Sequence, residues 1–340
     1  MNLITGATGI VGAHVALKLL EAGEAVVAIK RSGTDISKTK TLFGYYTPNA
    51  QVLFDKIKWI EADINDIYSI LDALEGIDTV YHCAGFVSFD SRDDKKLFKI
   101  NAEGTANVVN ACLEKNIKTL CHVSSIATLQ NPDITSGIDE SVYWKSSPRA
   151  SAYAISKYNA EREVWRGVEE GLNAVIVNPG IVLSPGFWNQ SSGTLFSKAH
   201  KGMVFYTEGS TATIDARDVA ACMIELVKTK QYNKRFVLIE NNYSYKEILS
   251  IIHQQFSKKT PSIKATKWLL NTASFFEKIV SMFSGGSRQL SQETISSLTD
   301  KNTYSNNKIV SQLSYNFIPL HDSVKFICKA YSGDLNKSHA

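Results

Sequence analysis

The chain of 340 residues is longer than one average domain, which predicts two lobes. Hydrophobic residues make up 44% of the sequence and charged residues 21%, so the composition excludes a disordered or fibrous protein. The formal net charge of +4 comes from residues spread along the chain without a long basic run, which argues against nucleic-acid binding.

Short β-type runs alternate with helical patterns from the first residues to about residue 180. The expected strands, in chain order, are Leu3–Thr5, Ala25–Ile29, Ile57–Ile60, Thr79–His82, Thr119–Val123 and Ala174–Asn178. Between them, apolar residues recur at spacings of three and four, as in Ile10–Glu21 and Ala102–Glu114. This alternation predicts an α/β fold of the Rossmann type, in which helices cover both faces of a doubly wound parallel sheet.

The regular alternation ends after Pro179, where a stretch rich in Gly, Ser and Asn begins. We therefore expect an NAD(P)-binding Rossmann domain over residues 1–182 and a smaller substrate-binding lobe over residues 183–340. Segments near 211–240, such as the strand-like Phe236–Ile239, are candidates to return to the main sheet, which would interleave the two lobes.

The sequence gives no sign of export, of a metal site or of a membrane span. The five cysteines include no CxxC pair, which argues against a disulfide framework and against zinc. The chain begins almost directly with a strand and a glycine turn, which leaves no room for a signal peptide. Trp268–Phe283 is apolar but short and contains two charges, so it predicts an amphipathic helix; attachment to a membrane surface is the alternative. We expect a cytoplasmic protein without a metal or membrane partner.

Glycines at relative positions one, four and seven lie between the first expected strand and the first expected helix, in the sequence TGATGIVG. Glycine permits a tight turn and a close approach of the backbone to a pyrophosphate, whose charge the amides and dipole of the helix N-terminus stabilise. The order of strand, turn and helix favours a dinucleotide site, with an ordinary βα turn as the alternative. Its candidate residues are Gly6, Thr8, Gly9, Ile10 and Gly12.

Lys30, Arg31 and Ser32 follow the second expected strand and bear on the choice of dinucleotide. An acidic residue commonly receives the ribose hydroxyls of NAD at this point. Two cations and a hydroxyl suit the additional 2′-phosphate of NADP instead, with Lys38 as a further candidate contact. The expected cofactor is therefore NADP(H), with NAD(H) as the alternative; in the simplest interpretation these residues form a solvated basic turn.

Two later loops also fit a cofactor cleft, although each is compatible with ordinary loop structure. Asp63 and Ile64 follow the third strand, where a carboxylate can accept a hydrogen bond from the adenine amino group. Cys83, Ala84 and Gly85 follow the fourth strand, where small residues let a dinucleotide pass close to the chain.

Tyr153 and Lys157 lie four residues apart at the start of a helical pattern that runs to about Val168. Residues at this spacing share a helix face, so the phenol and the ammonium can point into one cleft. A phenol with a pKa of about 10 is a poor acid or base at neutral pH. We expect Lys157 to lower the pKa of Tyr153 and to hold the nicotinamide ribose.

Two polar residues complete the catalytic candidates. Ser125 closes the fifth strand, at the carboxyl edge of the sheet where ligands bind, and its hydroxyl can polarise a substrate oxygen. Asn101 lies at the start of the helix expected over Ala102–Glu114 and is a candidate to connect Lys157 to solvent. A plain helix N-cap is the alternative interpretation of Asn101.

Together with Asn178-Pro179-Gly180 and the segment TIDARDVA at 213–220, these motifs resemble the extended short-chain dehydrogenase/reductases over nearly the whole chain. The resemblance implies that Ser125, Tyr153 and Lys157 are catalytic, with Tyr153 as acid or base. It also implies that Pro179 and Ile181 border the nicotinamide. Subunits of the family often form homodimers through the helices that match Ala102–Glu114 and Ala152–Val168.

Nucleotide-sugar epimerases and dehydratases of this family usually carry Tyr-Gly shortly after the catalytic serine and often an acidic residue at the end of the second strand. This chain has neither, and 124–129 (SSIATL) and 28–31 (AIKR) look more like the dihydroflavonol 4-reductase and 3β-hydroxysteroid dehydrogenase branch. The resemblance thus implies reduction of a small ketone or aldehyde by NADPH. The alternatives are an NAD-dependent nucleotide-sugar epimerase or dehydratase, and a sensor or scaffold that binds NADP without turnover.

The substrate pocket is expected to draw on residues 86–89, 126–131 and 183–192 and on the second lobe. Its aromatic members favour an apolar or aromatic ligand, but aromatic residues are at least as often part of a core. These members are Phe86, Phe89, Phe187, Trp188, Phe205 and Tyr206.

Overall fold

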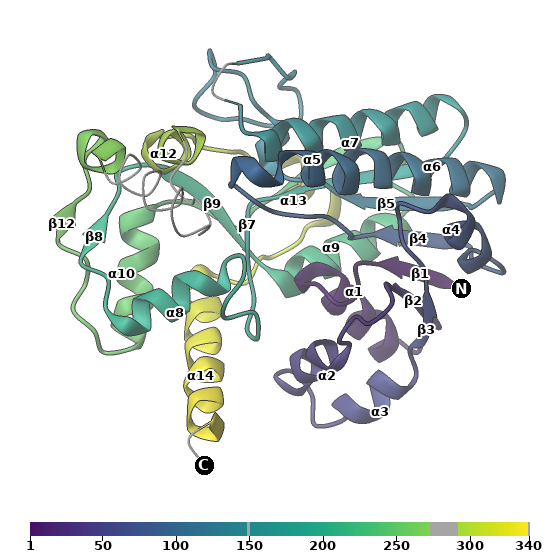
Figure 1. Ribbon diagram of the computed structural model, residues 1–340, viewed down its shortest axis with the longest axis horizontal. Coiled ribbons are helices and arrows are strands. Elements are labelled where there is room, and N and C mark those ends of the chain that lie inside the picture. Colours follow the sequence, from purple (N-terminus) through teal and green to yellow (C-terminus); the bar gives the residue numbers. More distant parts are fainter. Residues whose placement is uncertain (148–149, 273–291, 339–340) are drawn as a thin grey trace.

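The computed structural model describes residues 1–147, 150–272 and 292–338, and its central element is a seven-stranded parallel sheet (Figure 1). The strand order is β10-β6-β5-β4-β1-β2-β3. The chain therefore builds one half of the sheet outward from β1 and then crosses back to build the other half from β4. Ligands bind at such a switch point, outside the carboxyl ends of the strands. The strands are β1 (Asn2–Thr5), β2 (Val26–Lys30), β3 (Lys58–Glu61), β4 (Thr79–His82), β5 (Thr119–Val123), β6 (Ala174–Pro179) and β10 (Lys234–Leu238).

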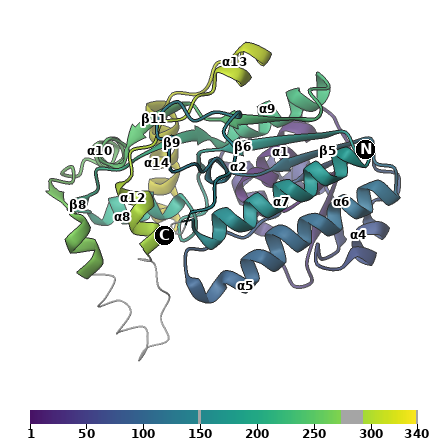
Figure 2. The same ribbon diagram turned by 90° about the horizontal axis from the view of Figure 1, so that it is seen from above.

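Helices cover both faces of this sheet, as Figures 1 and 2 show. The central strands β5 and β6 are buried along their whole length, as expected for parallel strands between two layers of helices. One face is covered by α1 (Ile10–Glu21), α2 (Ser37–Gly44), α3 (Ala50–Asp55), α9 (Ala216–Lys228) and α13 (Asn307–Leu313). The other is covered by α4 (Ile67–Ala73), α6 (Gly104–Glu114) and α7 (Ala152–Glu169).

The predicted fold class is confirmed, and each of the six strands expected from the alternating pattern is present within one residue at either end. The later segment Phe236–Ile239 lies largely within β10, which pairs in parallel with β6 at the edge of the sheet. Leu238 is thereby aligned with Pro179, so a strand from late in the chain supports the end of β6.

A second group of elements lies beside the main sheet. Its apolar core includes Leu183, Phe196, Ile252, Val324 and Ile327. A three-stranded sheet is formed by β7 (Ile181–Leu183), β9 (Ser210–Asp215) and β11 (Asn241–Ser244), and a two-stranded sheet by β8 (Phe205–Tyr206) and β12 (Ile263–Lys264). The helices are α8 (Gly193–Lys201), α10 (Tyr245–Gln255), α12 (Gln292–Thr299) and α14 (Leu320–Ser338). In Figure 1, α8, α10 and α14 lie together, away from the seven-stranded sheet.

The helix expected over Trp268–Phe283 is only partly covered, because residues 273–291 lie outside the described residues; residues 267–272 are helical. Among the described residues, no helix is both long and apolar enough to cross a membrane. In the same part of the chain, no cluster of three or more His, Cys, Asp or Glu side chains has the arrangement of a metal site. All five cysteines are free.

Candidate active site

The glycine turn joins β1 to α1 at the carboxyl edge of the sheet. Gly6 has φ +69°, a conformation that favours glycine, and a Cβ there would lie 2.6 Å from the backbone nitrogen of Ala84. At Gly12 a Cβ would lie 2.3 Å from the carbonyl oxygen of Gly6. The N-cap residue Gly9 offers no side chain to the first amides of α1, and Thr8 is half-buried in the turn. The turn therefore fits the pyrophosphate of a dinucleotide, which needs close backbone and uncapped amides.

Lys30, Arg31 and Ser32 lie at the carboxyl end of β2, next to this turn in the sheet. Lys30 is half-buried, and its Nζ lies 3.7 Å from a carboxylate oxygen of Glu61 at the end of β3. Arg31 and Ser32 are exposed, as is Lys38 in α2. Of the two cations that the sequence places here, Lys30 is thus partly neutralised by a carboxylate that follows it by 31 positions in the chain.

In the loop after β3, Asp63 and Ile64 contact other residues of the protein. Oδ1 of Asp63 accepts hydrogen bonds from the backbone nitrogen of Asn65 at 2.9 Å and from its Nδ2 at 2.8 Å. Ile64 is buried against α6, where a Cβ on Gly104 would lie 2.7 Å from Cδ1 of Ile64. These contacts give both residues a structural role in the loop, whatever part they have in the adenine site.

The loop after β4, Cys83-Ala84-Gly85, reaches the catalytic candidates. The Ala84 backbone nitrogen donates a hydrogen bond to Oγ1 of Thr5 at 3.1 Å, which ties this loop to the end of β1. A Cβ on Gly85 would lie 3.4 Å from Oδ1 of Asn101 and 3.7 Å from Nζ of Lys157. Three separate segments of the chain therefore meet at Gly85.

The prediction that Asn101 begins a helix is wrong. Residues 94–114 form one continuous helical segment: α5 (Asp94–Leu97), a π-helical stretch (Phe98–Glu103) and α6. Asn101 lies inside the π-helical stretch, so it does not act as an N-cap. A π-helical turn inserts one extra residue per turn and turns side chains to a new direction, which is why such turns occur at functional sites.

The side chain of Asn101 joins two of the segments that meet at Gly85. It is 1% exposed, and its Oδ1 accepts a hydrogen bond from the backbone nitrogen of Phe86 at 2.7 Å. Its Nδ2 donates to the carbonyl oxygen of Phe86 at 2.9 Å and to Oγ of Ser156 in α7 at 3.0 Å. Asn101 therefore fixes the loop after β4 against the helix that carries Tyr153 and Lys157.

Tyr153 and Lys157 lie in the first two turns of α7, as predicted. The helix begins after Ser151, whose hydroxyl accepts a hydrogen bond from the backbone nitrogen of Ala154. Lys157 is 5% exposed, and its Nζ donates to the carbonyl oxygen of Val123 in β5 at 2.6 Å. Burial lowers the pKa of Lys157 to about 8, against an opposing effect of the Glu161 carboxylate.

Burial raises the pKa of Tyr153 above its ordinary value, and a hydrogen bond with the Ser125 hydroxyl opposes this rise. The net direction is upward because burial disfavours the charged phenolate; the lowering expected from Lys157 stays a prediction. The phenol keeps its proton at neutral pH. Its ring lies 5.8 Å from the ring of Phe89, centroid to centroid.

Ser125 lies at the carboxyl end of β5, where the chain enters a 3-10 turn (Ile126–Thr128). Its Oγ accepts a hydrogen bond from the backbone nitrogen of Ala127 at 3.1 Å, which fixes the side chain at the head of this turn. The preceding Ser124 is 3% exposed. Pro179 and Ile181 follow at the end of β6 and the start of β7, so they border the same edge of the sheet.

The aromatic candidates for the substrate pocket are dispersed. Phe89 is 46% exposed beside Tyr153, whereas Phe187 belongs to the main core. Trp188 packs toward α14, where its Nε1 donates to Asp334 at 2.9 Å. Phe205 and Tyr206 form the short strand β8 of the second group. Phe86 lies in the loop that Asn101 holds, with Nζ of Lys96 4.2 Å from its ring centroid.

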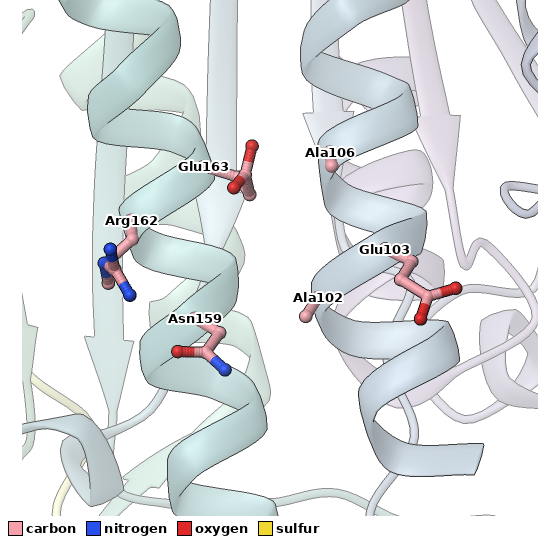
Figure 3. A pocket seen from close by; sticks show the side chains of 6 residues that line it. All are labelled: Ala102, Glu103, Ala106, Asn159, Arg162 and Glu163. Atoms are coloured by element: carbon pink, nitrogen blue, oxygen red, sulfur yellow. The ribbon is translucent and has the colours of Figure 1, made fainter. Parts of the chain in front are cut away.

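A hollow lies between the π-helical stretch with α6 on one side and α7 on the other, and Figure 3 shows the side chains that border it. These are Ala102, Glu103, Ala106, Asn159, Arg162 and Glu163. It is separate from the residues around Gly85 and lies on the two helices through which subunits were expected to pair.

Comparison with known proteins gives a consistent result. The NAD dependent epimerase/dehydratase family model matches residues 2–238. Sterol demethylase protein B of Methylococcus capsulatus is 27% identical over 267 residues, which cover 77% of this chain and 76% of that protein. Dihydroflavonol 4-reductase of Gerbera hybrida is 24% identical over 271 residues, which cover 74% and 72%.

The structure is also similar to that of UDP-glucose 4-epimerase from Thermotoga maritima, with a TM-score of 0.76 and 16% identity over 98% of this chain and 100% of that one. This likeness shows the fold. The match of the family model over more than half of the chain agrees with the Rossmann sheet, the glycine turn and the Tyr153–Lys157 pair. The chain belongs to the NAD dependent epimerase/dehydratase family, among the extended short-chain dehydrogenase/reductases, and is an NAD(P)-dependent enzyme.

Proposed function

We propose that this enzyme uses NADPH to reduce a ketone or aldehyde to an alcohol, with Tyr153 as the proton donor. The observation that carries the proposal is the half-buried phenol of Tyr153, beside Ser125 and one helical turn before Lys157. A general acid must hold its proton at the working pH and give it up as negative charge develops on the substrate oxygen. The raised pKa of Tyr153 meets the first condition.

Ser125 and Lys157 supply the charge stabilisation for this step. The Ser125 hydroxyl is at hydrogen-bond reach of the Tyr153 phenol and can donate to the developing alkoxide, a stabilisation that grows toward the transition state. The Lys157 ammonium is buried next to Gly85, where it can hold the ribose of the cofactor and favour departure of the proton from Tyr153. Asn101 contributes by holding the loop after β4, which contains Gly85, in place.

The cofactor would bind along the edge of the sheet from β2 to β6. Gly6, Gly9 and Gly12 would hold the pyrophosphate, and Pro179 and Ile181 would border the nicotinamide. NADPH, when bound, supplies the hydride that reduces the carbonyl carbon. Arg31 is the proposed contact for the 2′-phosphate, because its guanidinium is exposed and offers a planar set of hydrogen-bond donors. The nearby carboxylate of Glu61 pairs with Lys30 instead, at 3.7 Å.

The substrate side of the site is apolar where it can be traced. Phe89 is half-exposed at 46% and lies against the Tyr153 ring, so a substrate whose carbonyl reaches Tyr153 would contact an aromatic face. We propose that residues 183–340 supply the remaining walls, with β10 excepted as part of the main sheet. Relatives named for a sterol and for a dihydroflavonol support a substrate with an apolar ring system.

We also propose that the enzyme is a homodimer formed through α6 and α7. The hollow in Figure 3 presents the small residues Ala102 and Ala106, which allow close approach of a second helix pair. Glu103 and Arg162 border the same hollow with opposite charges. A two-fold axis brings one surface against its own copy, so each charge can face the other across the interface.

The test of the proposed reaction is consumption of NADPH by purified protein with a panel of ketones, aldehydes and steroids, each compared with Tyr153→Phe. We expect turnover that the substitution removes by a factor of about 10² or more, the usual contribution of a general acid, with cofactor binding by fluorescence unchanged. Full activity in Tyr153→Phe would refute the assignment. Retention of NAD on purification together with conversion of UDP-sugars would favour an epimerase instead.

A further inference from the structure

A buried carboxylate lies on the same helix as the catalytic candidates and has no role in the steps above. Glu161 follows Lys157 by four residues and Tyr153 by eight, so all three share one face of α7. Its side chain is 2% exposed. A buried ionised carboxylate is stable only where hydrogen bonds and an opposite charge compensate for the lost hydration.

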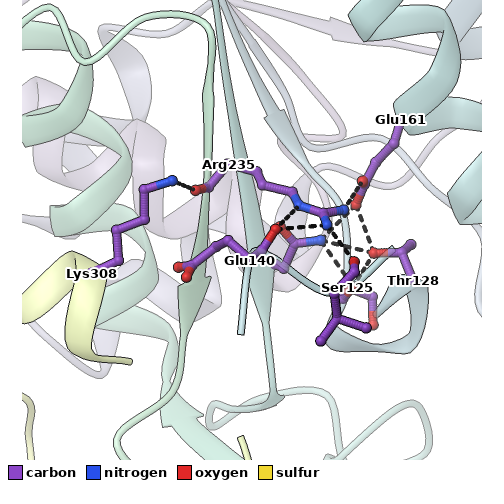
Figure 4. A network of polar contacts seen from close by, with 8 residues as sticks. Ser125, Thr128, Glu140, Glu161, Arg235 and Lys308 are labelled. Atoms are coloured by element: carbon purple, nitrogen blue, oxygen red, sulfur yellow. Dashed lines mark hydrogen bonds and ion pairs between the residues drawn. The ribbon is translucent and has the colours of Figure 1, made fainter. Parts of the chain in front are cut away.

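Three groups provide this compensation, and Figure 4 shows two of them, Thr128 and Arg235, beside Glu161. Oε1 of Glu161 lies 2.7 Å from Oγ1 of Thr128 and 2.5 Å from Nδ2 of Asn178. Oε2 lies 3.4 Å from Nη1 of Arg235 in β10. Thr128 and Asn178 both donate to Oε1, and the guanidinium beside Oε2 places an opposite charge next to the carboxylate.

The same two donors also reach the backbone of Ser125. Nδ2 of Asn178 lies 3.1 Å from the carbonyl oxygen of Ser125, and Oγ1 of Thr128 lies 2.9 Å from it. The hydroxyl has one proton to donate and the amide has two, and Nδ2 of Asn178 lies 2.9 Å from Oγ1 of Thr128. With Thr128 donating its one proton to Glu161, Asn178 can donate one proton to Glu161 and the other to the Ser125 carbonyl oxygen, which links the carboxylate to the backbone of the catalytic serine.

Arg235 is itself held in place by hydrogen bonds to residues other than Glu161. Its Nε and Nη2 donate to the carbonyl oxygen of Glu140 at 3.0 and 2.8 Å, and Nη2 donates to that of Val142 at 2.6 Å. Nζ of Lys308 donates to the carbonyl oxygen of Arg235 at 2.9 Å. The guanidinium thus has a fixed position from which to orient Glu161.

Lys157 faces several titratable groups, and they differ in charge. On β4 and β5, His82 and His122 are buried, and burial lowers both pKa values, so the rings are neutral. Burial raises the pKa of the Cys83 thiol to about 12, so it is neutral as well. Among the described groups that act on Lys157, the Glu161 carboxylate is the one that raises the pKa of Lys157 most.

We infer that Glu161 is a positioning residue of this enzyme: held by Arg235, its carboxylate fixes Ser125 through Thr128 and Asn178 and balances the charge of Lys157. This inference rests on the catalytic roles proposed above for Ser125 and Lys157. It assigns two separable contributions to Glu161, one from its shape and one from its charge.

Two substitutions in the full-length enzyme separate these contributions. Glu161→Gln keeps the length of the side chain but removes the charge, so the alkaline limb of the kcat/KM profile is expected to move to lower pH by about one unit. Glu161→Asp keeps the charge but withdraws it from Thr128 and Asn178, so kcat is expected to fall at least about tenfold while the limb stays in place. Glu169→Gln, at the exposed end of the same helix, is the matched control and should leave both quantities unchanged.

Thermal unfolding monitored by circular dichroism shows which variants are folded. If the Glu161→Gln protein does not fold because Arg235 has lost its opposite charge, the kcat of a folded Glu161→Asp variant still tests the positioning role. A wild-type kcat and pH limb in the folded Glu161 variants, as in Glu169→Gln, would overturn the positioning role alone. A wild-type enzyme that reduces no carbonyl compound would overturn the proposed function and this inference with it.

Discussion

The buried ammonium of Lys157 gives a pH dependence that can be calculated from the structure. Its pKa is lowered to about 8 from the ordinary value of 10.5 because burial disfavours the charged form. Lys157 is therefore charged below that pH and neutral above it. At one pH unit above the pKa, roughly a tenth of the molecules keep the charge, since each unit is a factor of about ten.

If the charge is needed for catalysis, kcat/KM for carbonyl reduction should be highest below pH 8, half-maximal near pH 8 and about tenfold lower one unit above it. Because kcat/KM reports the ionisations of the free enzyme, the measurement is the initial rate of NADPH oxidation at limiting substrate across this range. Tyr153 and Cys83 do not contribute to this limb, since burial raises the pKa of both.

Reversibility separates this titration from unfolding: enzyme held one unit above pH 8 and returned to neutral pH should recover its full rate. A kcat/KM that stays constant to two units above pH 8 would refute the reasoning, because it would mean either that Lys157 retains its proton despite burial or that its charge is dispensable. Thermal unfolding measured at each pH shows that the protein is intact throughout.

Three further expectations follow from the geometry. Gly12→Ala places a methyl group 2.3 Å from the Gly6 carbonyl oxygen, so it should abolish dinucleotide binding by fluorescence titration and lower the melting temperature; wild-type affinity would contradict the packing. Arg31→Ala should weaken NADPH binding about tenfold or more and leave NADH binding unchanged, consistent with loss of one charge-assisted phosphate contact; equal losses for both cofactors would refute the preference. Ala106→Arg should convert a dimer into a monomer in light scattering, and an unchanged mass would exclude this interface.

The parts of the fold that depend on local sequence could be predicted well. Short strands that alternate with helical patterns, and the glycine turn between β1 and α1, follow from backbone preferences and periodicity. The spacing of Tyr153 and Lys157 fixes their common face once the helix is recognised. The same spacing, continued by four residues, places Glu161 on that face as well.

The remaining features depend on contacts between distant segments. Glu161 and Arg235 are 74 residues apart and meet only because β10 pairs with β6. The position of Asn101 depends on a π-helical stretch, whose periodicity differs from the one used to place the helix. The direction of the Tyr153 pKa shift depends on how much water the folded chain excludes, and a sequence pattern carries no such information.

The placement of β10 also limits how this protein can be divided. A fragment that ends at residue 182 would lose the neighbour of β6, exposing the backbone edge of a strand that is buried along its whole length. It would also leave Glu161 in an apolar environment without its cation. Such a fragment should aggregate rather than fold, so any chimaera that exchanges the second group of elements has to keep residues 234–238 with the main sheet, as a second, discontinuous piece of it.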